Sequence, residues 1–389
     1  MFAKEWHCLE TGWASVNKQD EKLCGDFFSS FEHQGKKVFV LSDGLGSGVK
    51  ANILSTLTTT ILGTLLSRGI SLDECINSVA TTLPICRARK LAYSTFTVVQ
   101  MEHGAVHLAQ YGNPDAILLR GGQNVNYPQG VRFIGEKEIH ESRIPFVLGD
   151  ILVLLSDGVT NAGIGKLALA GWQRGELVAF LERLDTEKMS AGHIAASIID
   201  CCLTLGEGSL DDDASVLVIK RRGRCVVNML VGPPENKEDD NRVLKMFFAK
   251  EGLRVVCGGS TAQAVSKYLQ KPVVVDQGGA VAGIPAMSRI ENVDCVTEGV
   301  ITLKKALEHC RCYLENPMTL LKLSKQKDGA AVLALLLIET ATDINIYFGM
   351  AANDAHEGTG FDFQVKLTLI KQIADCLQQM NKNAKISFC

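Results

Sequence analysis

The sequence feature that most restricts the fold is a short motif, Ser-Asp-Gly, that occurs twice, each time at the end of an apolar run. The stretch VFVLSDG ends at Asp43 and Gly44, and ILVLLSDG ends at Asp157 and Gly158. Apolar runs of this length predict buried β-strands, and the glycine after each aspartate predicts a sharp turn. Two strands would therefore each deliver a carboxylate at the strand's C-terminal edge.

Two further acidic positions lie beside predicted strands. Asp26 precedes the first apolar run, and the acidic run 211–213 leads into the strand ASVLVIK. Any one of these motifs could be an ordinary turn. Together they have one economical explanation, which is that their carboxylates converge on hard divalent cations. Mg²⁺ and Mn²⁺ prefer carboxylate and carbonyl oxygens as ligands. The sequence therefore predicts a metal centre.

A dinucleotide-binding loop is the alternative interpretation of the glycines that follow Asp43. Such a loop needs the spacing G-x-G-x-x-G and an acid about 20 residues further on, at the end of a second strand. Here the glycines stand at 44, 46 and 48, so the third comes one residue early, and no strand-ending acid follows at that distance. This alternative fits poorly.

The order of the motifs resembles the metal-dependent Ser/Thr protein phosphatases (PPM, or type 2C), and most closely the branch typified by stage II sporulation protein E. The motifs are G-D at 25–26, S-D-G-x-G-x-G-x-x-A at 42–51, S-D-G at 156–158 and D-D-x-S at 212–215. The resemblance covers about Gly12 to Arg221. It implies an α+β fold, a four-layer α/β/β/α sandwich of two mainly antiparallel sheets, with the metals in a cleft at one edge.

The resemblance also assigns roles to the acidic residues. Asp43 would bridge two Mn²⁺ or Mg²⁺ ions, and the Gly44 carbonyl would be a ligand of one of them. Asp157 and Asp212 would hold the other ion, and Asp26 would act on the second metal or its waters. Asp26, Asp43 and Asp157 are thus the expected catalytic residues. A hydroxide shared by the ions would attack the phosphorus of phosphoserine or phosphothreonine in a regulatory protein.

The sequence departs from the family at the residue that holds the substrate phosphate. Many members carry an arginine five residues before the first aspartate, where this chain has Glu21. Phosphate binding would then depend on the metals or on nearby bases. The candidates are Lys22 and the pair Arg87 and Arg89, although a solvated helix end is the simpler explanation of the latter pair.

The basic connector KRRGR at 220–224 predicts a boundary between a phosphatase domain, 1–222, and a second domain, 225–389. Before it, Tyr93 to Val125 has the pattern of an antiparallel meander. After it, strands and helices alternate, which predicts a smaller α/β domain with a mainly parallel sheet. Helices are expected at Asn52–Leu66, Leu72–Thr82, Gly165–Leu184 and Ala191–Leu205, and near 239–249, 260–269, 297–310 and 363–380.

One motif of the second domain could bind a ligand. Gly259, Ser260 and Thr261 follow the apolar run RVVCG and precede a predicted helix. Free amides at a helix N-terminus attract phosphate or carboxylate groups. The alternative is a tight turn in which Ser260 is the N-cap. A small-molecule ligand on this domain therefore stays an open alternative, as does a homodimer.

Composition excludes several classes of protein. A net charge of −3 without a polybasic tail does not indicate nucleic-acid binding. Thirteen scattered cysteines without a C-x-x-C pair predict free thiols in a reducing cytoplasm. The longest uncharged apolar stretch, Gly329 to Ile338, is too short to cross a bilayer, so no membrane partner is expected. Two rival functions remain, a non-catalytic phosphatase-fold sensor or partner-binding module, and a hydrolase of small phosphoesters.

Overall fold

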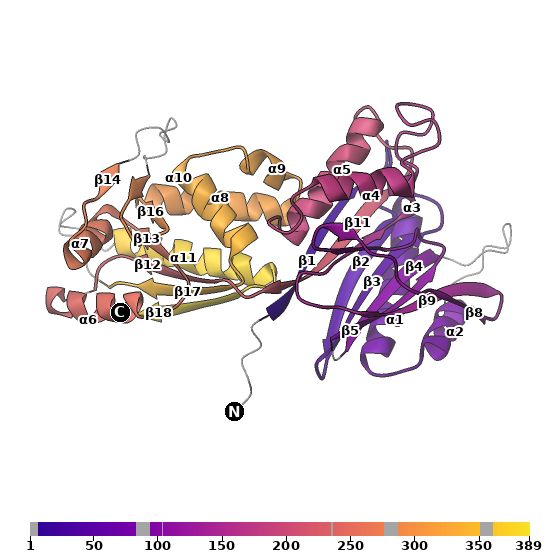
Figure 1. The fold of residues 1–389 in the computed structure, drawn as a ribbon, viewed down its shortest axis with the longest axis horizontal. Helices are drawn as coiled ribbons and strands as arrows, with labels where there is room; N and C mark the ends of the chain where they lie inside the picture. Colours follow the sequence, from indigo (N-terminus) through magenta and orange to yellow (C-terminus); the bar gives the residue numbers. More distant parts are fainter. Residues whose placement is uncertain (1–6, 83–93, 103, 235, 276–286, 351–360) are drawn as a thin grey trace. The chain divides into compact units, whose positions relative to one another are not determined.

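The computed structural model describes residues 7–82, 94–102, 104–234, 236–275, 287–350 and 361–389. The chain divides into two compact units (Figure 1). One spans Leu9–Gly223, and the other spans Arg224–Cys389 and also includes Cys8. The basic connector lies at this division. Each unit is described by itself.

The first unit contains a six-stranded antiparallel sheet. Its strand order is β2-β3-β4-β5-β9-β8. The strands are β2 (Asp26–His33), β3 (Lys36–Gly44), β4 (Ser94–Glu102), β5 (Ala105–Tyr111), β8 (Gly130–Ile134) and β9 (Lys137–Pro145). Two helices, α1 (Gly48–Ser67) and α2 (Leu72–Thr82), pack on one face of this sheet. The meander continues through β8 and β9, which the sequence pattern did not predict.

A second sheet of the first unit has the strand order β1-β11-β10-β6-β7. The strands are β1 (His7–Val16), β6 (Ile117–Arg120), β7 (Gln123–Asn124), β10 (Ile151–Leu155) and β11 (Ala214–Gly223). The helix α5 (Ala191–Leu205) packs against β11. Strand β10 pairs antiparallel with both β11 and β6.

The two sheets bury a shared core between them. Strand residues alternate between the two faces of a sheet. Phe39 and Leu41 of β3 accordingly pack with Leu154 of β10 and Leu217 of β11, whereas Val40 points to the helix side. Residues of β3 with odd numbers therefore face the second sheet. Asp43 is one of these odd-numbered residues, so its side chain lies at one end of the space between the sheets.

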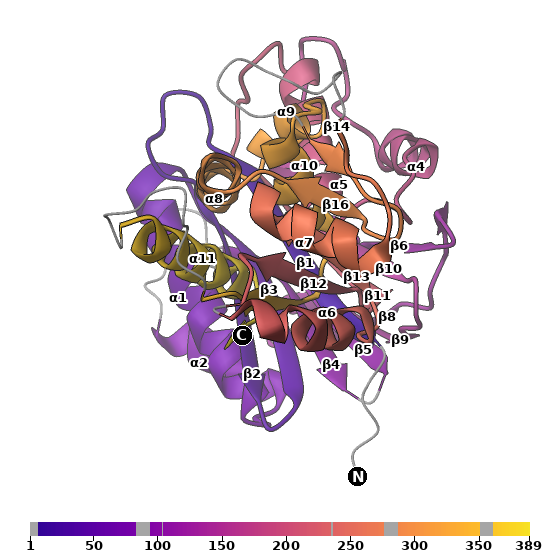
Figure 2. The ribbon, with the colours of Figure 1, turned by 90° about the vertical axis from the view of Figure 1, so that its left-hand side faces the viewer.

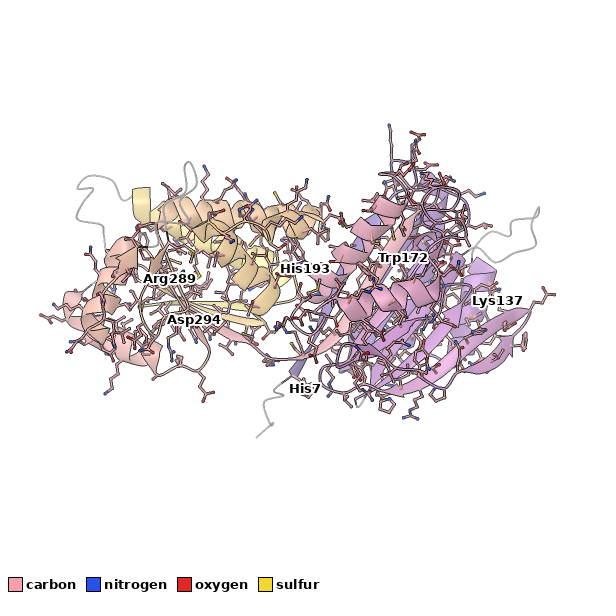
Figure 3. All side chains as sticks on the ribbon, turned by 45° about the horizontal axis from the view of Figure 1, so that its top comes forward. His7, Lys137, Trp172, His193, Arg289 and Asp294 are labelled. Carbon is pink, nitrogen blue, oxygen red and sulfur yellow. The ribbon has the colours of Figure 1, made fainter. Side chains whose placement is uncertain are left out.

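The predicted helix at 165–184 is wrong in its first half. Only Arg174–Arg183 forms the helix α4, and Asp157–Thr160 forms a short helix, α3, directly after β10. Gly163, Gly165 and Gly171 all have positive φ angles, which break a helix at these points. Trp172, labelled in Figure 3, anchors the turn segment by packing edge-on against Phe180, with ring centroids 5.3 Å apart.

Helix α1 is, among the described helices, the one long and apolar enough to cross a membrane by length and composition. Its uncharged run, Ala51 to Ser67, contains several serines and threonines, so it did not stand out as an apolar stretch. Leu54, Leu62 and Leu66 of α1 are buried in the core with Val38 and Val40 of β3. The apolar composition is explained by this packing, as in the core helix of a globular protein.

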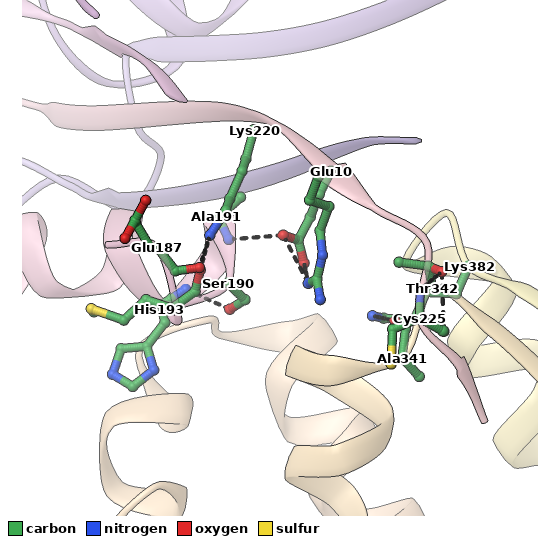
Figure 4. Close-up of polar contacts among 12 residues, drawn as sticks. Glu10, Glu187, Ser190, Ala191, His193, Lys220, Cys225, Ala341, Thr342 and Lys382 are labelled. Carbon is green, nitrogen blue, oxygen red and sulfur yellow. Dashed lines mark hydrogen bonds and ion pairs between the residues drawn. The ribbon is translucent and has the colours of Figure 1, made fainter. Parts of the chain in front are cut away.

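A buried lysine fixes the segment that precedes α5. Lys220 is 4% exposed, and its ammonium donates to the backbone carbonyls of Thr186, Glu187 and Met189 at 2.8, 2.8 and 2.7 Å. Figure 4 shows Lys220 beside Glu187 and α5. Burial lowers the pKa of the Lys220 ammonium. Three carbonyl acceptors at once compensate for burying the charge.

The second unit has a seven-stranded sheet with the order β14-β15-β16-β13-β12-β17-β18. The strands β16, β13, β12, β17 and β18 run parallel, and the short β14 and β15 form an antiparallel edge. Their bounds are β12 (Val226–Val231), β13 (Leu253–Cys257), β14 (Val274–Val275), β15 (Ser288–Arg289), β16 (Cys295–Thr297), β17 (Asp343–Phe348) and β18 (Asn383–Phe388).

Helices cover both faces of this sheet (Figure 2). The helices α6 (Asp240–Phe248) and α7 (Gly259–Leu269) share a core with one face. The helices α8 (Val300–Glu315), α10 (Gly329–Leu335) and α11 (Phe361–Gln379) share a larger core with the other. Within the described residues of this unit, the other helical segments are the short α9 (Thr319–Leu323), a 3₁₀ turn at Lys237–Asp239 and a π-helical turn at Leu336–Thr340.

Candidate metal centre

Asp26 and Asp43 lie side by side on the first sheet. They are register partners at the end of the antiparallel β2–β3 ladder. Directly opposed residues of an antiparallel pair project their side chains to the same face. That face carries Phe28 and Leu41, which belong to the core between the sheets. Both carboxylates therefore lie at the edge of the space between the two sheets.

Asp157 and the acidic run 211–213 come to this edge from the second sheet. Strand β10 ends just before Ser156, whose N–H donates to the Ser215 carbonyl at 3.0 Å. A Cβ on Gly158 would lie 2.1 Å from the Asp213 carbonyl oxygen, so the turn after Asp157 requires glycine. The two strand ends are thereby locked together. The sequence predicted a glycine turn here, and this close approach is its physical reason.

The carboxylates affect one another electrostatically. Burial raises the pKa of Asp43, and the charges of Asp26, Asp157 and Asp212 raise it further. Burial also raises the pKa of Asp26, with smaller upward contributions from Asp213 and Asp157. These shifts require the acidic side chains to lie near one another. The structure thus brings together the four carboxylates that the sequence singled out.

Several oxygens of this cluster are buried without a hydrogen-bond partner. Both carboxylate oxygens of Asp26 and Oδ1 of Asp157 lack one among the described residues. The hydroxyls of Ser156 and Ser215 are near enough to lower the pKa of Asp26, yet neither forms a hydrogen bond of ordinary geometry with it. Buried polar atoms are normally satisfied. Oxygen donors without partners suit a divalent cation, so the residues fit the predicted ions by chemistry.

The spacing of the side chains is looser than that of a formed metal site. Within the described part of the chain, no three His, Cys, Asp or Glu side chains already have ion-binding geometry. The assignment of each ligand, including the Gly44 carbonyl, stays a prediction.

Gly44 itself is required by packing. A Cβ at this position would lie 1.9 Å from the Ala51 carbonyl oxygen, inside the first turns of α1. The Gly44 N–H donates to the Gly25 carbonyl at 3.2 Å. The glycine therefore lets α1 pack against the end of β3 and keeps Asp43 next to the residue that precedes Asp26.

Lys18 is a neighbour of the cluster that sequence reasoning missed, and it is bound to Asp213, the second acid of the D-D-x-S motif. Asp213 is 3% exposed, and its Oδ1 accepts a hydrogen bond from the Lys18 backbone N–H at 2.9 Å. This bond draws the segment before β2 toward the cluster. The Lys18 charge lowers the pKa of Asp212, against the larger upward effect of burial. No motif marks Lys18, because the bond that positions it joins residues 195 positions apart.

Glu21, at the position of the family arginine, binds the start of α1. Its Oε1 accepts a hydrogen bond from the Ser47 hydroxyl at 2.8 Å, and a Cβ on Gly48 would lie 2.4 Å from its Oε2. Ser47 is the N-cap of α1. A carboxylate is favourable at the positive N-terminal end of a helix. The acidic residue thus has a structural role here.

The structure gives little support for the other residues that were predicted to bind the substrate phosphate. Lys22 is exposed. Arg87 and Arg89 lie outside the described residues. A cavity of about 270 Å³ opens beside Asp212, but its lysine, Lys166, already donates to the carbonyls of Gly206 and Ser209 at 2.9 and 3.1 Å.

A cysteine near the cluster is unsuited to nucleophilic chemistry. Burial raises the pKa of the Cys24 thiol, and the charges of Asp26 and Asp213 raise it further. The reactive species of a cysteine nucleophile is the thiolate. The described cysteines are all free, as predicted. The Cys24 thiol is therefore no candidate for the chemistry of this site, and the carboxylates stay the predicted groups.

Comparison with known proteins gives matches in the first unit. Residues 33–222 match the family model described as Stage II sporulation protein E (SpoIIE). The matched range contains Asp43, Asp157 and Asp212, and Asp26 lies just before it. The C-terminal unit lies wholly outside it.

Two curated relatives and one solved structure illustrate the similarity. The chain is 25% identical over 222 residues to Stage II sporulation protein E of Priestia megaterium, covering 55% of this chain and 36% of that protein. It is 24% identical over 220 residues to the protein of the same name from Bacillus subtilis (strain 168), covering 54% and 26%. The chain thus spans about a third and a quarter of these relatives. A structure of the PP2C phosphatase domain and a fragment of the regulatory domain of SpoIIE from Bacillus subtilis is 21% identical, with a TM-score of 0.47, and covers 56% of this chain and 63% of that one.

Proposed function

Because residues 33–222 form a domain of the stage II sporulation protein E family, we propose that this chain is a metal-dependent phosphatase that hydrolyses phosphoserine or phosphothreonine in a regulatory protein. The observation that carries the proposal is the convergence of Asp26 and Asp43 from one sheet with Asp157 and Asp212 from the other. The proposal includes the four-layer order, supported by the helices packed on each sheet and the core between them.

The residues of the cluster would hold two Mn²⁺ or Mg²⁺ ions. When bound, such ions polarise phosphoryl oxygens and lower the pKa of water toward neutrality. The chain itself contributes rigid placement, because Asp26, Asp43 and Asp157 adjoin the ends of hydrogen-bonded strands. Burial of Asp26, with partial burial of Asp43 and Asp157, also limits the access of bulk water to the carboxylate oxygens.

The substrate would approach the cluster beside Asp212. The cavity there is lined partly by Asn161 and Ile164 of the turn segment that follows α3. We propose Lys18 as the base that helps to hold the substrate phosphate, since its charge already acts on Asp212. A phosphorylated regulatory protein as substrate, and cytoplasmic localisation without nucleic-acid or membrane partners, remain parts of the proposal.

The decisive experiment measures Mn²⁺-dependent release of phosphate from a phosphoserine peptide and from p-nitrophenyl phosphate. The variants Asp43→Asn and Asp157→Asn should abolish metal-stimulated turnover. Asp211→Asn should not, because Asp211 is the exposed acid of the same run. Absence of turnover in the folded wild type would instead support a non-catalytic sensor. Turnover of the small ester alone would support a small-phosphoester hydrolase.

A further inference from the structure

The parallel strands of the second unit bring two helix starts to one edge of the sheet. Strands β13 and β16 pair in parallel, with Cys257 opposite Thr297. The helices α7 and α8 directly follow these strands. Ligands of open α/β sheets bind outside the carboxyl ends of the strands. This edge is therefore a natural place for a binding site.

The first turn of α7 offers unused backbone donors. The helix begins at Gly259, one residue before the predicted start at Ser260, and its N-cap is Gly258 with no side-chain cap. Gly258 has φ 111° and ψ 136°, a conformation that side-chain-bearing residues rarely adopt. The first N–H groups of a helix have no acceptor within the helix. Gly259 and Ser260 are exposed, so their N–H groups are accessible to a ligand.

The start of α8 lies next to the start of α7. A Cβ on Gly299, the N-cap of α8, would be 4.0 Å from the Cα of Gly258. No side chain caps α8 either. The N-terminus of each helix carries about half a positive charge. Two such ends in contact repel each other, and an anion bound between them would relieve the repulsion.

A buried hydroxyl lies at the same place. Thr261 is 1% exposed, and its Oγ1 has no hydrogen-bond partner in the described parts of the chain. A Cβ on Gly258 would lie 3.2 Å from this oxygen, so the hydroxyl points back to the helix start. Thr302, the third residue of α8, is likewise buried with an unpartnered hydroxyl. Such hydroxyls normally find a partner.

One acidic group faces this helix start. The carboxylate of Glu298 lies with Oε2 3.5 Å from the position of a Cβ on Gly259. Glu298 is exposed. Its negative charge partly neutralises the helix ends, and it would compete with an incoming anion.

We propose that the first turn of α7 binds the phosphate group of a small phosphorylated molecule. The backbone N–H groups of Gly259 and Ser260 and the hydroxyl of Thr261 would donate to its oxygens. A tetrahedral oxyanion accepts hydrogen bonds from several directions, which suits donors on a turn and a side chain together. The site is independent of the metal centre in the first unit.

The test is calorimetric titration of the full-length chain in EDTA, with inorganic phosphate and with AMP as probes. EDTA removes cations from the first unit, so that phosphate does not bind there. Saturable binding of either probe is expected. Tighter binding of inorganic phosphate would indicate free phosphate as the ligand, and tighter binding of AMP would indicate a phosphate carried on a small molecule. Thr261→Val should weaken binding about tenfold. Glu298→Gln should strengthen it at least about twofold, because a like charge is removed.

A matched control separates binding from folding. Thr186 of the first unit is also 1% exposed with an unpartnered hydroxyl, so Thr186→Val removes the same group elsewhere and should leave affinity unchanged. Because the Thr261 hydroxyl has no partner, Thr261→Val should fold as well as the wild type. No saturable binding of either probe, or unaltered affinity in Thr261→Val, would overturn the proposal. Binding should persist in Asp43→Asn, so this result is independent of phosphatase activity.

Discussion

Asp26 and Asp43 stand opposite each other in the β2–β3 ladder, where a sheet normally pairs apolar or complementary side chains. Asp26 is 2% exposed and Asp43 is half-buried. Like charges directly opposite destabilise a strand pair, and burial adds to the cost. The arrangement therefore lowers the stability of the cation-free protein. A bound cation would turn the same pair into a stabilising one.

Asp43→Asn should separate stability from function. In EDTA the variant should melt at the same temperature as the wild type or higher, because a buried charge among acids is removed. With Mn²⁺ the wild type should gain thermal stability and the variant should not, and turnover should fall at least about 100-fold. Thermal denaturation with and without Mn²⁺ measures this. An equal Mn²⁺-induced shift in both proteins would exclude Asp43 as a ligand.

Lys18 and Lys22 should differ in their effect on catalysis. Lys18→Met keeps the backbone N–H that binds Asp213 but removes the charge near Asp212. We expect kcat/KM for a phosphoserine peptide to fall about tenfold. Lys22→Met, which alters an exposed lysine, should change it less than about twofold. Steady-state kinetics measure kcat/KM for both variants. A larger loss in Lys22→Met than in Lys18→Met would instead identify Lys22 as the phosphate-binding base.

Lys220→Met should destabilise the first unit strongly. The change leaves three carbonyls without the ammonium that binds them, which costs about 3 kcal/mol. The matched control is Lys188→Met, which should leave stability nearly unchanged, because the Lys188 side chain is 85% exposed and its pair with Asp185 is screened by solvent. Urea denaturation monitored on the first unit measures the difference. Equal stability of the two variants would contradict the role given to Lys220.

His309 should make the second unit sensitive to acid. Burial lowers the pKa of this imidazole below its ordinary value of 6.5, and its Nε2 has no partner among the residues described. The unfolded chain then binds the proton more readily than the folded one, so stability falls as the pH drops below about 6.5. Hydrogen exchange of α8 should become faster between pH 7.5 and 5.5, after correction for the intrinsic rate.

His309→Gln should reduce this pH dependence, since no imidazole remains to be protonated. His107→Gln, at an exposed site of the first unit, should not alter it. A wild-type α8 with the same protection at both pH values would show that His309 does not couple to stability.

The acidic edge was the most predictable part of the protein, because the strand that ends at Gly44 and the one that ends at Leu155 are marked by apolar runs with glycine turns. The neighbours of that edge were not predictable. Ser156, Ser215 and Lys18 reach Asp26 and Asp213 only through the packing of two sheets, and no local pattern records such long-range contacts. In the sequence, Glu21 stands out only because the family arginine is absent from this position. The structure shows that its carboxylate accepts a hydrogen bond from Ser47 at the start of α1, which gives it a structural role.

In the second unit, the alternation of strands and helices predicted the parallel sheet, but not its last strand. β18 (Asn383–Phe388) alternates polar and apolar residues at the chain end and pairs only with β17. The prediction of a helix at 165–184 was wrong in its first half for a different reason. Its apolar spacing was helical, but three glycines with positive φ angles interrupt it.

The apolar composition of α1 also matters during synthesis. A 20-residue segment of this kind, exposed on a nascent chain, is prone to aggregation until it is covered. The β2–β3 hairpin, against which α1 packs, precedes it in the sequence and leaves the ribosome first. The surface that shields α1 is therefore available when the helix emerges, and truncations that remove this hairpin should convert α1 into a target for chaperones.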